Sequence, residues 1–441
     1  MKKRIKSVKK MFDYAMKQLC ETPDLCAKKP DKDFTRNRKL PFRKVISMLL
    51  AIAGKSLRNE IEEYFGHSKH TPSASAFVQQ RQKISPNALP TLFRLFVMQN
   101  KSVQLYKGLR LIAVDGSHFR IPLNPSDADS FFPSSTGDYN IMHLDAMYDL
   151  LGQTYLDACL KGQRTADERS ALCTMVNRAN GPKALILADR GYEGFNVMAH
   201  IQNKGWNYLI RIQDPSTKGG IAAALDLPQE EEFDVYIDLS LTKCQSKKAK
   251  QMAKDRNKFR VLMPGRKHDY LTESSTKNGD PVFYHLPFRV VRFKLTDDSY
   301  EVVVTNLDAK EFPPEELKRL YNMRWGIETS FRELKYTVGL TLFHAKKVEY
   351  IYQEVFARLI TYNFTQLIVA PATILDPNKK YAYKPNFAVA VNVCRQFILG
   401  NVSPPQVEAT ILRNVSPIRP GRTFQRDLTD RKPVSFNYRV A

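Results

Sequence analysis

The sequence is poor in the residues on which small secreted or metal-stapled folds depend. Its 441 residues include only six cysteines, and no two of them are spaced as Cys-x-x-Cys. This pattern indicates neither a disulfide scaffold nor a zinc ribbon, and it favours reduced thiols in a cytoplasmic protein. The eight histidines form no His-x3-His set, so the sequence does not predict a histidine metal site.

Long apolar runs and phosphate-binding loops are also missing. The richest apolar stretch, residues 45–53, is too short to span a bilayer. The basic start at Met1–Arg4 is not followed by the apolar run of a signal peptide. No G-x4-G-K-[ST] segment occurs, which argues against a nucleotide-hydrolysing enzyme of that type. We therefore expect a globular protein with no membrane partner.

Negative charge is scarce relative to positive charge. Lysine and arginine number 68 against 45 aspartates and glutamates, which leaves a net charge of +23. A folded protein with this surplus favours a polyanionic partner, because its cations neutralise phosphates and release counterions. No basic segment adjoins a lipid anchor, so we expect nucleic acid rather than a membrane surface.

Two short apolar runs end in an isolated aspartate. Residues 109–114 precede Asp115, residues 184–188 precede Asp189, and a glycine follows each aspartate within two positions. Such runs indicate buried central strands, and open α/β sheets bind ligands at the carboxyl ends of their strands. For one such aspartate, a simple turn residue is the ordinary alternative. Two matching cases favour a shared site.

A third segment, residues 321–335, reads as a helix that starts near Pro313 and Pro314 and stops at Gly339. The 3.6-residue period places an apolar stripe beside a polar one. The apolar stripe contains Leu320, Ile327, Phe331, Leu334 and Val338, and the polar stripe contains Tyr321, Arg324, Glu328 and Lys335. The alternative for the polar stripe is a solvated face, with an ion pair worth a few tenths of a kcal/mol.

These residues carry a resemblance. Asp115, Asp189 and Glu328 resemble the acidic triad of DDE transposases from bacterial insertion sequences. The spacing Tyr321-x2-Arg324-x3-Glu328-x6-Lys335 is similar to the Tyr-Arg-Glu-Lys signature of the insertion-sequence-four group, and Asp-Arg-Gly-Tyr from Asp189 is typical of it. The match runs from residue 108 to 347. It implies an α/β fold with a ribonuclease-H-like core, a mixed five-stranded sheet with helices.

The pattern of elements divides the chain as the resemblance implies. We expect a helical DNA-binding domain at 1–105, a catalytic core at 106–213 and 301–346, a β-rich insertion at 214–300, and a helical region with a basic tail at 347–441. Core strands are predicted at 109–114, 140–148, 153–160, 184–188 and 208–212, with helices at 166–178 and 195–204. Insertion strands are predicted at 233–237, 259–263, 282–286, 288–295 and 300–306. Further helices are predicted at 42–65, 348–369 (amphipathic) and 387–399.

The resemblance also implies the chemistry. Two Mg²⁺ ions, or Mn²⁺ in their place, would bind the three carboxylates, with Asp115 as the bridging ligand. Tyr321, Arg324, Lys335, Arg190 and Trp325 are the expected DNA contacts. Packing is the alternative for Trp325, which lies at the edge of the polar stripe.

The implied reaction is metal-dependent cleavage at the ends of an insertion sequence, followed by strand transfer. Its partners would be double-stranded DNA, as terminal inverted repeats and as target, and a second copy of the chain on paired ends. Two alternatives stay open: a nuclease with the same core, and an inactive DNA-binding descendant. The nuclease predicts cutting without joining, and the long insertion argues against it. The descendant would have lost part of the triad, which is complete here.

Overall fold

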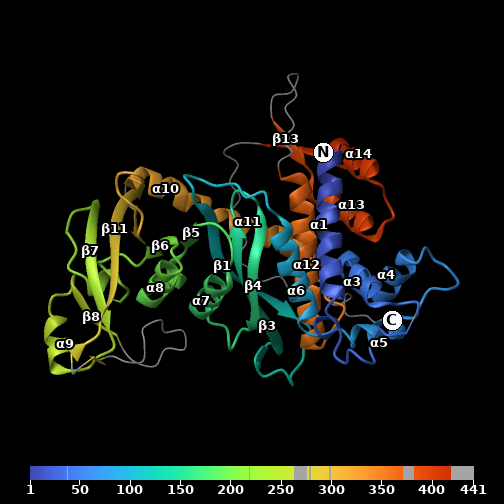
Figure 1. Cartoon of the computed structure of the whole chain (residues 1–441), viewed down its shortest axis with the longest axis horizontal. Coiled ribbons are helices and arrows are strands. Elements are labelled where there is room, and N and C mark those ends of the chain that lie inside the picture. Colours follow the sequence, from blue (N-terminus) through green and yellow to red (C-terminus); the bar gives the residue numbers. More distant parts are fainter. Residues whose placement is uncertain are drawn as a thin grey trace.

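The computed structural model describes residues 1–36, 38–217, 219–262, 276–277, 280–296, 299–370 and 382–418. The molecule is elongated (Figure 1): a large twisted sheet occupies the middle, helices from both ends of the chain gather on one side, and the insertion strands lie at the other side. The predicted basic tail beyond residue 418, with Arg419, Arg422, Arg426, Arg431, Lys432 and Arg439, lies outside the described residues.

The sheet runs in the order β2-β3-β1-β5-β6-β12-β11-β7-β8. In addition, β4 pairs with β3 on the edge of β3 that faces away from β1. β1 is antiparallel to β3 and parallel to β5, and β5 is parallel to β6. The strands are β1 (Arg110–Ile121), β2 (Phe131–Phe132), β3 (Tyr139–Asp149), β4 (Thr154–Gly162), β5 (Ala184–Ala188), β6 (Asn207–Ile212), β7 (Phe233–Thr242), β8 (Phe259–Val261), β11 (Tyr284–Thr296) and β12 (Ser299–Thr305). The predicted core strands are therefore confirmed, and the first and fourth of them lie side by side as a ribonuclease-H-like core requires.

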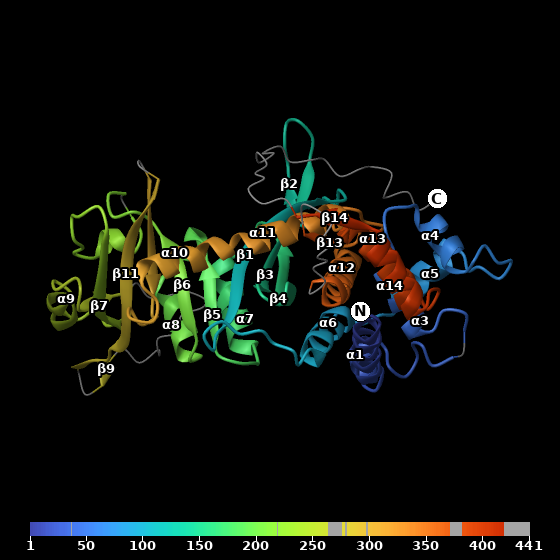
Figure 2. The ribbon, with the colours of Figure 1, turned by 90° about the horizontal axis from the view of Figure 1, so that it is seen from above.

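Helices cover both faces of this sheet. α7 (Glu168–Arg178) and α8 (Phe195–Asn203) lie on one face, and α10 (Pro314–Met323) and α11 (Trp325–Arg332) run along the other (Figure 2). Alternate residues of β1 point to opposite faces of the sheet and pack into different hydrophobic cores. Ile112 and Val114 pack with α7 and α8, whereas Ala113 belongs to the core that contains α11. The sheet core is thus buried from two sides, as its near-continuous apolar strands predict.

The predicted signature helix follows a single path with two irregularities. α10 begins after Pro313 with Glu315 and Glu316 in its first turn, Arg324 links it to α11, and a π-helical turn (Glu333–Thr337) continues to Gly339. The apolar stripe is buried throughout. The path ends where Gly339 takes a φ of +85°, a left-handed conformation that glycine adopts without strain.

The ends of the chain pack together as one helical region. α12 (Val348–Val369) lies at its centre, against α1, α3, α6, α13 and β4. The surrounding helices are α1 (Lys2–Cys20), α2 (Pro23–Cys26), α3 (Phe42–Ala51), α4 (Leu57–Tyr64), α5 (Ala74–Arg81), α6 (Ala88–Gln99), α13 (Phe387–Leu399) and α14 (Pro404–Arg413), with the short strands β13 (Tyr383–Pro385) and β14 (Val415–Pro417). The division into domains stays a prediction.

Several predicted elements differ from the observed ones. α12 has the predicted bounds, but the prediction that it is amphipathic was wrong. It is buried on nearly every face, because other helices and β4 surround it. The predicted helix 42–65 is broken into α3 and α4 near Gly54, and the Ser56 hydroxyl accepts a hydrogen bond from the Asn59 amide to start α4.

The strand predictions for the insertion were wrong at one point. Residues 282–286 and 288–295 were expected as two strands, but β11 runs through Pro287 as one. Pro287 faces Asp238 of β7, and pairing with β12 starts only at Arg289, so the missing amide proton costs no ladder bond on that side. The insertion strands β7, β8 and β11 thereby extend the core sheet. α9 (Lys247–Met252) and the hairpin of β9 (Thr276–Lys277) with β10 (Asp280–Pro281) complete this region.

Two further features concern the cysteines and the lengths of the helices. All six cysteines are free thiols. Within the described ranges, no helix combines the length and the apolar character that crossing a membrane requires.

Candidate active site

The register of two parallel strands brings Asp115 and Asp189 together. Val114 of β1 is the partner of Ala188 of β5, and an aspartate follows each of these residues in the sequence. The prediction that Asp115 lies at the end of a strand was wrong. Asp115 lies inside β1, because β1 continues beside β3 after its parallel partner β5 stops. The two carboxylates therefore sit where the parallel pairing ends.

Glu328 reaches this edge of the sheet from α11. Arg324 joins the groups: its Nη2 lies 3.1 Å from Glu328 Oε1 and its Nη1 lies 3.9 Å from Asp115 Oδ2. Gly326 lets α11 approach the turn after β3, since a Cβ there would lie 2.9 Å from Leu150 Cδ2. Ser330 and Tyr155 hold the next turn through hydroxyls 2.8 Å apart. The helix is thus fixed on the sheet with Glu328 toward the two aspartates.

The three carboxylates share one electrostatic environment. Burial raises the pKa of Asp115 to about 7, and the charges of Asp189 and Glu328 add to that effect. Arg324 and the Gly116 amide, which donates to Asp115 Oδ1 over 2.9 Å, act in the opposite direction. One arginine does not balance the negative charge of this cluster. A divalent cation with oxygen ligands fits the charge and the donor set.

The five residues predicted to contact DNA fall into two groups. Tyr321 is buried, and Arg324 is only 4% exposed, with its guanidinium 5.5 Å from the centre of the Tyr321 ring and 5.0 Å from that of Trp325. Trp325 is 52% exposed, Arg190 is exposed, and Lys335 donates from Nζ to the His118 carbonyl over 2.7 Å. Two of the four residues of the polar stripe, Tyr321 and Arg324, are therefore buried. The alternative interpretation, in which the whole stripe is a solvent-exposed helix face, does not hold.

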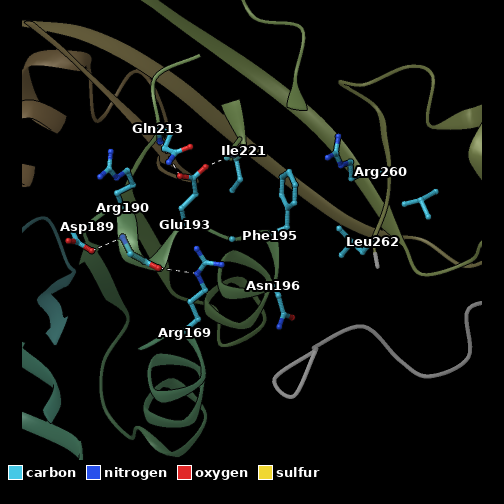
Figure 3. A pocket seen from close by; sticks show the side chains of 14 residues that line it. Arg169, Asp189, Arg190, Glu193, Phe195, Asn196, Gln213, Ile221, Arg260 and Leu262 are labelled. Carbon is cyan, nitrogen blue, oxygen red and sulfur yellow. Dashed lines mark hydrogen bonds between the residues drawn. The ribbon is translucent and has the colours of Figure 1, made fainter. Parts of the chain in front are cut away.

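A cavity of about 600 Å³ opens beside Asp189 (Figure 3). The side chains of Arg169, Arg190 and Arg260 line it, and Arg169 Nε donates to the Gly191 carbonyl over 3.0 Å. Its second acid, Glu193, accepts hydrogen bonds from the amides of Gln213 and Ile221. The cavity therefore offers three cations, with one of its two carboxylates already held by backbone amides.

The structure also gathers three groups that the sequence interpretation missed. Ligand atoms of His143, Asp145 and Glu168 lie within 4.8 Å of one another, so the described residues include a second cluster able to hold a metal ion. Two of them have a sequence signal: His143 and Asp145 are two positions apart in a predicted strand and so share a face. This histidine–aspartate pair has strand spacing and so differs from the His-x3-His pattern that is missing from the sequence.

The fold and the acidic edge of the sheet together define a class of enzymes. A ribonuclease-H-like sheet that carries carboxylates at the end of its central parallel pair is the framework of metal-dependent enzymes that transfer phosphoryl groups on nucleic acids.

Comparisons with known proteins narrow this class. A family model described as "Transposase DDE domain" matches residues 106–364. The transposase InsG for insertion sequence element IS4 of Escherichia coli (strain K12) is 23% identical over 354 residues, which cover 75% of this chain and 70% of that protein. The cryo-EM structure of a piggyBac transposase synaptic complex with hairpin DNA matches with a TM-score of 0.42 and 9% identity, over 87% of this chain and 77% of that one.

Because the family model matches more than half of the sequence, this chain belongs to the transposases with a DDE domain. It is an enzyme of DNA transposition, and its reaction is phosphoryl transfer on DNA. Enzymes of this family use divalent metal ions. The resemblance inferred from the Tyr-Arg-Glu-Lys spacing is confirmed.

Proposed function

We propose that this transposase cuts at the ends of an insertion sequence and joins the freed 3′-hydroxyl to target DNA, with Asp115, Asp189 and Glu328 as its catalytic carboxylates. One observation carries the proposal: the β1–β5 register and α11 bring these three residues, distant in sequence, to one edge of the sheet. The raised pKa of Asp115 supports it, because the charges of both partners contribute to the shift.

We assign Mg²⁺ as the metal, with Mn²⁺ as a substitute and two ions as the working number. Asp115, Asp189 and Glu328 would hold these ions. When bound, such a pair supplies Lewis acidity and lowers the pKa of an attacking water or hydroxyl. The Oδ1 atoms of Asp115 and Asp189 accept hydrogen bonds from the amides of Gly116 and Gly191, at 2.9 Å and 2.8 Å, which orients each carboxylate.

Arg324 acts first as a positioning residue. It lies between two aromatic rings and two carboxylates, so it holds Glu328 in place before DNA arrives. Tyr321 packs under it and touches DNA only if the helix moves. Lys335, Arg190 and Trp325 are more open, and we assign them direct contacts: the cations to phosphates and the indole to a base.

The three-arginine cavity extends this surface away from the triad. We infer that a strand leaving the cleavage site passes along it, with phosphates near Arg169, Arg190 and Arg260. The remaining partners follow from the proposed reaction: terminal inverted repeats and target DNA as duplexes, residues 1–105 as the repeat-binding domain, and a dimer that pairs two ends in the bacterial cytoplasm.

The test uses purified protein, Mg²⁺ and a duplex carrying the ends that flank its own gene, beside Glu328→Gln. We expect cleaved and joined products from the wild type, no products from the variant, and none after a chelator is added. Glu315→Gln is the matched control, because Glu315 lies on the same helical path in the first turn of α10. Cleavage of any DNA without joining would instead identify a nuclease. Binding without chemistry would identify an inactive descendant.

A further inference from the structure

His143, Asp145 and Glu168 lie behind the catalytic edge, on the opposite face of the sheet. Asp145 is the cross-strand partner of Gly116, and Asp115 is the partner of Ala146. Directly opposed residues of an antiparallel pair share a face, and successive residues alternate. His143 and Asp145 therefore project toward α7, where Glu168 occupies the first turn, whereas Asp115 projects toward α11.

The distances in this cluster are those of metal ligands. His143 Nε2 lies 3.1 Å from Asp145 Oδ1 and 3.5 Å from Glu168 Oε1. Ligand atoms about 2.0–2.1 Å from one Zn²⁺ ion in tetrahedral geometry are about 3.3–3.4 Å apart. The cluster could therefore accept an ion with small movements of its side chains.

The hydrogen-bond partner of the imidazole supports the same arrangement. His143 Nδ1 lies 3.2 Å from Gln163 Oε1, an atom that only accepts hydrogen bonds, so Nδ1 carries the proton. In the neutral ring, Nε2 then presents a lone pair toward the two carboxylates. Histidine ligands of metals are usually oriented in this way by an acceptor on the other nitrogen. The positive charge that the two carboxylates need is then supplied either by a proton on Nε2 or by a metal ion beside its lone pair.

Two further observations point to a missing ligand. Asp145 is 1% exposed, and its Oδ2 has no hydrogen-bond partner among the described residues. An unpaired buried carboxylate oxygen is costly. The second observation is the space at Gly116, where a Cβ would lie 2.5 Å from His143 Nε2 and 2.6 Å from Glu168 Oε1. Only glycine leaves these two groups room to converge.

We propose that His143, Asp145 and Glu168 form a second divalent-cation site, separate from the catalytic triad, for a transition metal such as Zn²⁺. An imidazole with two carboxylates suits Zn²⁺ and related ions, whereas Mg²⁺ prefers oxygen ligands only. The site also borders the triad, since Glu168 Oε2 would lie 2.8 Å from a Cβ at Gly191, two positions after Asp189. A cation here would offset negative charge behind the catalytic edge.

The test measures Zn²⁺ binding to the full chain by equilibrium dialysis after treatment with a chelator, without DNA. Asp115→Asn with Glu328→Gln forms the background, so that two of the carboxylates assigned to the catalytic metals are removed. We expect this double variant to retain one tightly bound Zn²⁺ that excess Mg²⁺ does not displace. Adding His143→Gln or Glu168→Gln should weaken that binding more than tenfold. Adding Gln163→Ala should weaken it about 10–100-fold through the lost orientation of the ring.

His285→Gln is the matched control. His285 also pairs with a carboxylate, Asp238, but it lies in β11 of the insertion and is exposed, so its loss should leave the bound Zn²⁺ unchanged. Thermal melting without metal checks that each variant is folded. If His143→Gln does not fold, Glu168→Gln decides, since that side chain is partly exposed in the first turn of α7.

Two results would overturn the proposal. The background protein could bind no Zn²⁺, which would identify a protonated His143 as the cation between the carboxylates. It could also keep its Zn²⁺ after both ligand substitutions, which would place the ion elsewhere. Neither result bears on the catalytic role of Asp115, Asp189 and Glu328, because the readout contains no DNA chemistry.

Discussion

Replacing Arg324 by methionine should tighten metal binding while it lowers DNA cleavage. The guanidinium occupies the position of a cation, 3.1 Å from Glu328 Oε1 and 3.9 Å from Asp115 Oδ2. It therefore opposes a metal that needs the same oxygens. Methionine keeps the apolar volume between Tyr321 and Trp325 but carries no charge. Cleavage should fall because nothing then holds Glu328 toward the aspartates.

The size of the effect follows from the distances. Two unit charges about 4 Å apart interact by about 1 kcal/mol in water and about 4 kcal/mol at an effective dielectric constant near 20. The side chains of Asp115 and Glu328 are 18% and 28% exposed, so solvent screens this site and the lower half of the range applies. A loss of repulsion of roughly 1–2 kcal/mol corresponds to about 5- to 30-fold tighter binding of Mn²⁺.

The assay is calorimetric titration of Mn²⁺ into chelator-treated protein without DNA, followed by cleavage of end-bearing duplex. Arg332→Met is the control, because Arg332 is exposed at the end of the same helix. Its Mn²⁺ affinity should stay at the wild-type value. Equal or weaker Mn²⁺ binding by Arg324→Met would refute the view that this arginine and the metal share their ligands.

Substitutions at three further positions test the surrounding geometry. Lys335→Ala should weaken binding to cleaved ends and reduce the slope of affinity against salt by about one, and an unchanged slope would argue against a phosphate contact. Asp189→Ala should abolish cleavage but leave DNA binding within a few-fold, since it removes a proposed metal ligand; lost binding in a folded variant would contradict that role. Gly326→Val should lower cleavage, because a branched side chain displaces α11 from Leu150, whereas Gly326→Ala needs only the end of that leucine to move; equal activity of the two variants would show that the close approach is unimportant.

Much of the acidic edge of the sheet could be predicted from the sequence, because local rules determine where its residues lie along each element. Apolar runs fixed two buried strands, and their aspartates follow directly after the paired segment. Helical periodicity put Arg324 and Glu328 on one side of a turn, four positions apart. The remaining step, that β1 and β5 are neighbours and parallel, came from the resemblance, since strand order depends on contacts between distant segments.

Burial was harder to predict than secondary structure. The polar stripe of the signature helix contains a phenol and a guanidinium that are both buried, because Gly326 lets α11 lie close to the sheet. α12 shows the same effect, with polar residues such as Arg358 and Asn363 buried in the helical region. Arg358 approaches the Leu49 carbonyl from within α12, at 3.3 Å, which compensates part of its burial. Such partners come from distant helices, and the periodicity of one segment does not contain them.

The glycines after the two aspartates connect the two sides of the sheet. Each donates its amide to the aspartate before it in the motif, Gly116 to Asp115 and Gly191 to Asp189. Each also leaves out a Cβ that would meet Glu168, at 2.6 Å from Oε1 for Gly116 and 2.8 Å from Oε2 for Gly191. A side chain at Gly116 would therefore collide with His143 and Glu168, and one at Gly191 would collide with Glu168 and Asp189. The same backbone that orients the two proposed catalytic aspartates thus makes room for the second cluster behind them.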